Sequence, residues 1–171
     1  MALTQVIGRG LGTQTTLAGS NTLVLDTNGI MTKPLQPAFS VTKSGHQSNY
    51  SGGTNTVTFD TEIFDQNGDF SSNTFTAPVT GRYQLSYHLY LDGLSQAANW
   101  LEAQIITSNR TYYYTIDPDF GQNNVYWHLS NTILADMDAN DTAYINLAVH
   151  SSATGTDDIN QASWFTGFLA C

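Results

Sequence analysis

Four histidines are the residues of this 171-residue chain best suited to hold a transition metal: His46, His88, His128 and His150. Imidazole nitrogens are common ligands of zinc and related ions. His88, His128 and His150 fall on the polar side of segments in which apolar and polar residues alternate, so they could converge across a sheet or along a threefold axis as ligands. No metal-binding spacing such as His-x-x-x-His occurs, and we therefore favour histidines that are hydrogen-bonded locally.

A pair of carboxylates is the second candidate chemistry. Asp117 and Asp119 flank Pro118 and follow the tyrosine run 112–114. A glycosidase needs two opposed carboxyl groups in a cleft, and this is the best such pair in the chain. The same spacing fits an ordinary proline turn, and no nucleophile elbow, glycine-rich phosphate loop or Cys–His pairing accompanies it. We expect no enzymatic activity.

Acidic residues cluster in two places where calcium could bind. Asp136, Asp138 and Asp141 precede one alternating segment, and an Asp-Asp pair at 157–158 follows Gly155. Calcium takes oxygen ligands from loops of this kind. Because the Asp-x-Asp-x-Asp-Gly loop is missing, we favour aspartates that form turns. We expect neither a metal nor a cofactor.

Aromatic residues are concentrated between positions 112 and 127. In a loop they could form a platform for a glycan, because sugar rings stack on aromatic faces and Asn and Asp can bind sugar hydroxyls. The alternative, which we favour, is that at least half of them pack in the core or in a subunit interface, where Tyr and Trp are enriched. The residues concerned are Tyr112, Tyr113, Tyr114, Phe120, Tyr126 and Trp127.

These candidate residues have to be positioned by β-strands. Apolar and more polar residues alternate in the segments 82–91, 101–106, 125–130 and 143–150, which is the period of a strand with one buried face. In 125–130 this period predicts that Val125, Trp127 and Leu129 face inward. No stretch keeps a helical period of 3.6 residues.

Turn signals separate the alternating segments. They are the Asn67-Gly68 pair, the segment 78–81 with Pro78 and Gly81, and the segment 138–141. Short strands at this spacing predict an all-β fold, an antiparallel sandwich or barrel.

Charge is scarce in this sequence. Five Lys and Arg residues against fourteen Asp and Glu residues give a net charge of −9, and only 11% of the residues are charged. Thr, Ser, Asn and Gly together make up 65 of the 171 residues. A chain with so few basic residues is poorly suited to bind nucleic acid, which requires Lys and Arg. No apolar run reaches the length of a membrane span, the N-terminus resembles no secretory signal, and the single cysteine, Cys171, allows no disulfide within the chain.

The chain is predicted to divide near residue 36. Residues 1–36 contain five glycines, no aromatic residue and one short strand candidate at 22–26, so they cannot bury a core. This segment is either a flexible tail or an extended arm that becomes ordered on a partner, and we favour the arm. Residues 37–171 form the predicted β domain.

Five segments of this domain resemble, in order, the globular head of complement component one-q. They are 37–41, 57–70, 75–87, 133–141 and 163–169, of which the last is similar to the closing strand almost position for position. The matching residues are Phe39, Phe59, Asn67, Gly68, Phe75, Pro78, Gly81, Tyr83, Tyr87, Phe165, Gly167 and Phe168. Physical reasons exist for several of them: Gly81 allows backbone angles closed to other residues, the Tyr83 hydroxyl needs a polar partner, and Gly167 allows a close approach or a bulge.

The resemblance implies an antiparallel jelly roll of about ten strands, shared with tumour necrosis factor, that associates into threefold trimers without catalysis. The collagen-like stalk of animal members and their cysteine at the position of Ala77 are missing here. Residues 3–12 look like the start of bacteriophage surface or tail-fibre proteins.

Two functional hypotheses follow from these resemblances. In the first, the protein is a trimeric decoration or cement protein on a phage head, whose arm at 1–36 clamps the major capsid protein or other virion subunits. In the second, it is the tip of a tail fibre that binds a host surface glycan through Tyr112, Tyr113, Tyr114, Asp117 and Asp119. Both place the protein in the virion, with no role in binding nucleic acid or membrane.

Overall fold

The computed structural model describes residues 24–25, 28, 30–48, 53–117, 121–151 and 157–171. The chain divides into two units, Met1–Leu35 and Gln36–Cys171, and each is described by itself. In the first unit, strands β1 (Val24–Leu25) and β2 (Met31–Thr32) pair antiparallel. Strand β1 falls in the segment 22–26 where the sequence predicts a strand, whereas residues 1–23 lie outside the described part.

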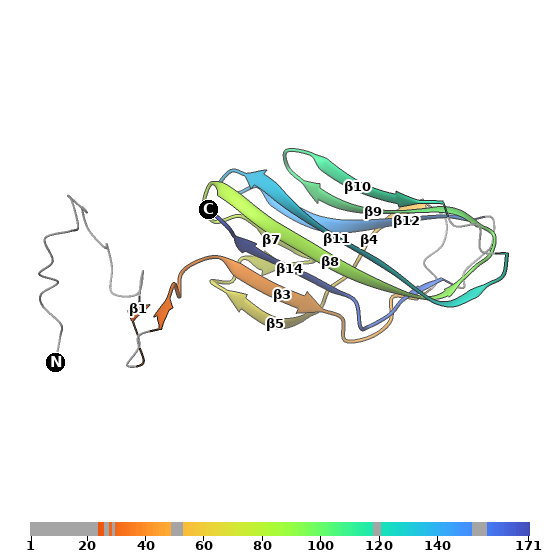
Figure 1. Ribbon diagram of the computed structural model, residues 1–171, viewed down its shortest axis with the longest axis horizontal. Coiled ribbons are helices and arrows are strands. Elements are labelled where there is room, and N and C mark those ends of the chain that lie inside the picture. Colours follow the sequence, from red (N-terminus) through yellow and green to blue (C-terminus); the bar gives the residue numbers. More distant parts are fainter. Residues whose placement is uncertain (1–23, 26–27, 29, 49–52, 118–120, 152–156) are drawn as a thin grey trace, which may run out of the picture. The chain divides into compact units, whose positions relative to one another are not determined.

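The second unit is made of two antiparallel sheets (Figure 1). The first sheet has the order β11–β8–β14–β3–β5, with β13 paired to β8, and the second has the order β10–β9–β12–β7–β6, with β4 paired to β12. The strands of the first sheet are β3 (Ala38–Thr42), β5 (Thr61–Gln66), β8 (Gly81–Leu94), β11 (Asn124–Met137), β13 (Asp158–Ile159) and β14 (Trp164–Leu169). The strands of the second are β4 (Gly53–Thr56), β6 (Phe70–Ser71), β7 (Thr74–Thr76), β9 (Ala98–Thr107), β10 (Thr111–Ile116) and β12 (Thr142–Ser151). No α-helix occurs among the described residues, so none there could span a membrane. The predicted all-β antiparallel sandwich is confirmed.

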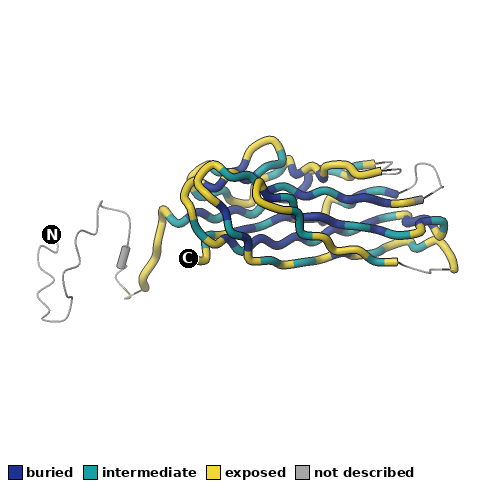
Figure 2. The backbone as a smooth tube through the Cα atoms, turned by 90° about the horizontal axis from the view of Figure 1, so that it is seen from above, coloured by how far each residue is buried: buried dark blue, intermediate teal, exposed yellow. Residues whose placement is uncertain are grey.

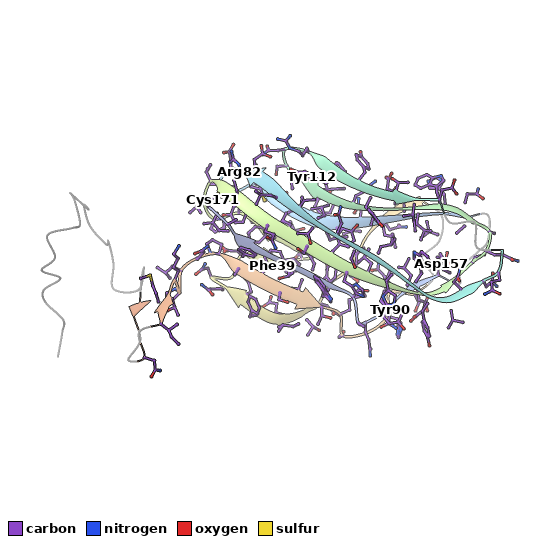
Figure 3. The ribbon with its side chains drawn as sticks, viewed as in Figure 1. Phe39, Arg82, Tyr90, Tyr112, Asp157 and Cys171 are labelled. Carbon is purple, nitrogen blue, oxygen red and sulfur yellow. The ribbon has the colours of Figure 1, made fainter. Side chains whose placement is uncertain are left out.

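The core lies between the two sheets and follows the predicted alternation. Buried and less buried positions alternate along the long strands (Figure 2). The Phe39 ring, labelled in Figure 3, packs against three other phenylalanines. Its centroid lies 4.7 Å from that of Phe75, 4.9 Å from that of Phe165 and 5.3 Å from that of Phe70. Ring pairs at these distances add specific aromatic attraction to the apolar area that they bury.

Val125 is the clearest departure from the alternation. Val125 was expected to face the core but is 66% exposed, so this expectation is wrong. The register pairs Asn124 with Leu94 and Tyr126 with Asp92, which places Val125 beside Gly93, near the end of both strands. Because Gly93 has no side chain, it provides no apolar cover for Val125 there.

The predicted turns are present and have the backbone angles that their residues allow. Asn67 and Gly68 both have positive φ, 90° and 74°, between β5 and β6. The Asp65 carboxylate accepts hydrogen bonds from the N–H groups of Asp69, at 3.0 Å, and Phe70, at 2.9 Å. These bonds close the turn and fix where the next strand begins.

The structure gives a physical reason for three of the residues that match the complement component one-q head, two glycines and one tyrosine. Gly81 does not have a positive φ, which corrects the expected reason for it; a Cβ there would lie 2.5 Å from Leu169 Cδ1 and 2.8 Å from the Cys171 carbonyl oxygen. Gly167 lies in β14 with an unshifted register, so it serves a close approach rather than a bulge. The Tyr83 hydroxyl donates a hydrogen bond to the Val79 carbonyl at 2.7 Å, as expected.

Candidate functional site

The outer face of the first sheet is uncharged over most of its length. We call "the uncharged face" the even-numbered residues of 84–90 in β8, 126–134 in β11 and 164–168 in β14, none of which is Asp, Glu, Lys or Arg. Several large side chains on it are exposed: Tyr126 by 59%, Leu134 by 58%, Phe168 by 42% and Trp164 by 37%. Phe168, one of the family-like residues, thus points away from the core.

The register sorts this face into rows across the strands. At one end Leu134, Gln84 and Phe168 lie side by side on β11, β8 and β14. In the middle the hydroxyls of Ser86 and Thr132 are hydrogen-bonded at 2.9 Å. Toward the other end the side chains are aromatic. The hydroxyl groups of Ser86 and Thr132 therefore lie between two groups of large exposed side chains.

An aromatic–histidine cluster occupies this last part, formed by His88, Tyr90, Tyr126, His128 and Trp164. His88 stacks on Trp164 with ring centroids 5.8 Å apart and an interplanar angle of 18°. The His128 ring lies 4.9 Å from that of His88 and 4.3 Å from that of Tyr90, which in turn contacts Tyr126 edge-on at 5.4 Å. Five rings from three strands therefore form one continuous surface.

The two histidines of the cluster are directly hydrogen-bonded. His88 Nε2 lies 3.0 Å from His128 Nδ1, and His88 Nδ1 lies 2.8 Å from the Ser130 hydroxyl. Burial, and secondarily the nearby His128, lower the pKa of His88, which favours the neutral form of that ring. The contact is made diagonally between antiparallel strands, which is why no short sequence spacing announces it.

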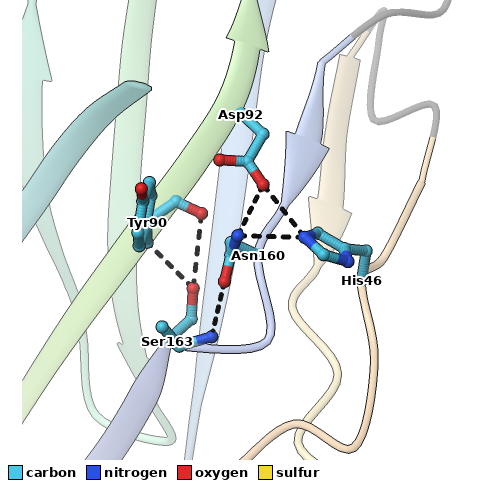
Figure 4. Close-up of polar contacts among 6 residues, drawn as sticks. His46, Tyr90, Asp92, Asn160 and Ser163 are labelled. Atoms are coloured by element: carbon cyan, nitrogen blue, oxygen red, sulfur yellow. Dashed lines mark hydrogen bonds and ion pairs between the residues drawn. The ribbon is translucent and has the colours of Figure 1, made fainter. Parts of the chain in front are cut away.

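The remaining histidines do not join this cluster. His150 lies on the second sheet and stacks on Trp100 with centroids 3.6 Å apart. His46 Nε2 lies 3.0 Å from Asp92 Oδ2, and the Asn160 amide nitrogen lies 2.6 Å from the same oxygen and 2.9 Å from His46 (Figure 4).

This second polar cluster connects three segments of the chain rather than forming a cation site. The Asn160 amide oxygen accepts a hydrogen bond from the Ala162 N–H at 2.8 Å, which turns the amide nitrogen toward His46 and Asp92. A cation placed between those two groups would meet N–H donors instead of a lone pair. Within the described part of the chain, no three His, Cys, Asp or Glu side chains come together to hold a metal ion.

The expected ligand loop at 112–114 is instead strand β10, which corrects the sequence-based interpretation. Its backbone groups pair with β9, and its side chains alternate. Tyr112 packs against the core, whereas Tyr113 is 62% and Tyr114 38% exposed, so the three rings cannot form one platform. Asp117 is exposed after the strand, and Asp119 lies outside the described residues together with Phe120.

The acidic clusters are engaged in turns. Asp141 Oδ2 accepts hydrogen bonds from the Asp138 N–H at 2.8 Å and from the Asn109 amide at 2.9 Å, while Asp136 pairs with Arg110 at 2.6 Å. Asp157 is buried and accepts the Ser95 N–H at 3.0 Å. Burial is the main reason that the pKa of Asp157 is raised.

The end of the chain is held by backbone contacts. The Cys171 carbonyl accepts a hydrogen bond from the Arg82 N–H at 2.6 Å, and the two residues lie close together in Figure 3. The thiol of Cys171 is free and exposed in the single chain.

Comparisons with known proteins agree with this architecture. The structure is similar to the globular domain of zebrafish complement 1qA protein, with a TM-score of 0.59 and 20% identity over 80% of this chain and 98% of that chain. It is also similar to murine APRIL, with a TM-score of 0.55 and 8% identity over 78% of this chain and 98% of that chain. At these identities the likeness shows the fold. The family model of the C1q domain matches residues 38–170, and the chain therefore belongs to the C1q domain family.

Proposed function

We propose that this protein is a structural module that associates with itself into a homotrimer through the uncharged face. The observation that carries the proposal is the exposure of four large side chains on one sheet face: Tyr126, Leu134, Trp164 and Phe168. Along β8 and β11 the charged residues in register with this face, Arg82, Asp92 and Asp136, lie only at its two ends. Cores of protein interfaces are depleted of charge and enriched in aromatic residues. A contiguous exposed apolar surface on a folded domain is typical of an interaction site.

A second copy of the same chain is the occupant that suits this surface. With a net charge of −9, two copies repel each other wherever their acidic surfaces meet. Contact through a surface that carries no charge avoids placing like charges against one another. A threefold arrangement is what the resemblance to complement component one-q and tumour necrosis factor implies.

We further propose that the trimer is a decoration or cement protein of a phage head, in which residues 1–36 clamp the major capsid protein or other virion subunits. Support comes from the glycine-rich composition of this arm, its lack of aromatic residues, and the resemblance of residues 3–12 to phage surface proteins. A segment that cannot bury a core of its own can still add backbone hydrogen bonds to a neighbour.

The second candidate is the tip of a tail fibre that binds a host glycan. The outer face of the second sheet favours it, because Tyr113 is exposed there beside Thr115, whose hydroxyl donates to Glu102 at 2.8 Å. A sugar ring can stack on an aromatic side chain while its hydroxyl groups donate hydrogen bonds to a neighbouring carboxylate. On this hypothesis the protein would be present in a few copies at the tail.

Native mass spectrometry tests the trimer. We expect the full chain to be a trimer and Leu134→Asp to be monomeric, since each copy would bury an unpaired carboxylate in the interface. Tyr113→Asp, on the other sheet, is the matched control and should remain trimeric. A monomeric wild type, or a Leu134→Asp variant that assembles normally, would refute the interface.

Localisation on purified virions by cryo-electron microscopy separates the two roles. Many copies on the head shell support decoration, and a few at the tail support adhesion. If a chain without residues 1–35 stabilises capsids as well as the full chain does, the clamp is wrong.

A further inference from the structure

The histidine pair of the uncharged face has the geometry of a two-ligand chelate. His88 Nε2 and His128 Nδ1 come from neighbouring strands and face each other at 3.0 Å. When a metal ion lies about 2.0–2.1 Å from each of two imidazole nitrogens, nitrogens at this separation subtend an angle of about 95° at the ion. A tetrahedral ion would need the nitrogens about 3.3 Å apart, so the observed separation suits a tetragonal ion better.

Both rings are already held in place. Ser130 lies 2.8 Å from His88 Nδ1, and if the ring N–H donates to its hydroxyl oxygen, the lone pair is left on Nε2. Metal-binding histidines usually have their second nitrogen fixed by such a partner. Trp164 stacks on the His88 ring and Tyr90 packs on the His128 ring, so little rotational freedom would be lost on binding.

Metal binding changes the position of one ring proton. In the metal-free pair one N–H lies between the two facing nitrogens and makes the hydrogen bond. An ion in that position requires both nitrogens to offer lone pairs, so the proton of His128 moves from Nδ1 to Nε2 and no proton needs to be released.

We propose that His88 and His128 form a binding site for a divalent transition metal that prefers tetragonal coordination by nitrogen, of the Ni²⁺ and Cu²⁺ class. Imidazole is a preferred ligand of these ions, and square-planar or tetragonal geometry is characteristic of them. In the single chain the remaining coordination positions are open to water. Hard cations such as calcium prefer oxygen ligands and have none of their preferred carboxylates on the uncharged face.

Both ligands belong to one chain, but they lie on the face through which the trimer is proposed to form, so the site has to be tested in a monomeric form as well. The two proposals can then fail separately. A monomeric wild type that binds Ni²⁺ through this pair would refute only the trimer. In the Leu134→Asp variant, which is expected to be monomeric, the pair is exposed, so a lack of Ni²⁺ binding by that variant would refute the metal site whatever the assembly of the wild type.

Isothermal titration of the untagged full chain with Ni²⁺ tests the site. We expect saturable binding of one ion per chain, and a loss of affinity of at least about tenfold in His88→Gln and in His128→Gln. Ser130→Ala should weaken binding by about tenfold through the lost orienting bond. His150→Gln is the matched control, because His150 stacks on Trp100 away from the pair, and its affinity should equal that of the wild type.

Circular dichroism melts establish that each variant is folded before its affinity is compared. As a second readout, electron paramagnetic resonance of bound Cu²⁺ should show coupling to two imidazole nitrogens in the wild type and to one in each histidine variant. Unchanged Ni²⁺ affinity in either His88→Gln or His128→Gln would overturn the proposal. An equal loss of affinity in His150→Gln would overturn it as well, since binding would then be unspecific.

Discussion

Gly167 is the position where a single methyl group should test the packing of the sandwich. An ideal Cβ at this residue would lie 2.7 Å from Leu85 Cδ2, 2.7 Å from Phe39 Cε1 and 3.1 Å from the Gln84 carbonyl oxygen. Phe39 cannot yield easily, because its ring is packed against three other phenylalanines. We expect Gly167→Ala to lower the free energy of unfolding by about 2 kcal/mol, within the range for overpacked cores.

Gly45→Ala is the matched control. It makes the same chemical change at a glycine with no atom within 4 Å of the added Cβ and without a positive φ. Alanine there restricts the unfolded chain and should leave stability unchanged or raise it by about 0.4–1 kcal/mol. The two variants should therefore differ by about 2–3 kcal/mol, which corresponds to about 4–12 °C in Tm for a domain of this size.

Urea denaturation followed by tryptophan fluorescence is a suitable assay, performed at several protein concentrations because self-association adds stability. Leu85→Val removes the Cδ atoms that the new methyl group would meet, so Gly167→Ala should cost less in that background, with a coupling of about 1 kcal/mol. If Gly167→Ala is as stable as Gly45→Ala, the side chains of Leu85 and Phe39 beside Gly167 are not a constraint and the reasoning fails.

Three further substitutions address polar contacts, each measured by the same denaturation assay. Tyr83→Phe removes the donor to the Val79 carbonyl and should cost about 1 kcal/mol, whereas Tyr113→Phe on the surface should cost nothing measurable; equal values would contradict the role of the hydroxyl. Burial outweighs the attraction of a nearby carboxylate and lowers the pKa of Lys43 to about 8 from its ordinary 10.5. The unfolded chain thus binds more protons between about pH 8 and 10.5, so this group makes stability rise with pH in that window, and the rise should be smaller in Lys43→Met. Asp65→Ala removes the acceptor of two turn N–H groups and should cost about 1.5 kcal/mol, while Asp65→Asn, which keeps one amide oxygen, should cost less.

The sequence predicted the fold because its determinants are local. Alternation along β8 and β12 and the Asn67-Gly68 turn depend only on neighbouring residues, and all are present in the structure. The reason for Gly81 was not predictable, because it is the chain end at Cys171 that approaches it, ninety residues away in sequence. The exposure of Val125 could not be predicted, because alternation does not show where a strand extends beyond the side chains that would bury its inner face.

The candidate site was harder to predict because it is made across strands. The sequence marks His88 and His128 as candidate metal ligands, but it does not show that they touch. Their contact depends on the register of β8 with β11, in which His88 lies opposite Ser130. The stacking of Trp164 on His88 could not be predicted, since in the sequence Trp164 is only one aromatic residue of the closing strand. The run 112–114 attracted attention instead, although a run of three tyrosines in a strand must divide between two faces.

The scarcity of charge acquires a structural meaning from where the carboxylates lie. Several accept hydrogen bonds from backbone N–H groups at turns: Asp60 from Ser44, Asp65 from Phe70, Asp141 from Asp138 and Asp157 from Ser95. Carboxylates with this role lie at the strand ends, where an ionised acceptor makes a stronger hydrogen bond to a backbone N–H group than a neutral acceptor does. The uncharged face of the first sheet then carries no ionised side chain although the chain carries −9, and Arg82, Asp92 and Asp136 lie only at its two ends. A surface of this kind, on a domain whose copies repel one another elsewhere, favours one defined mode of self-association over random aggregation.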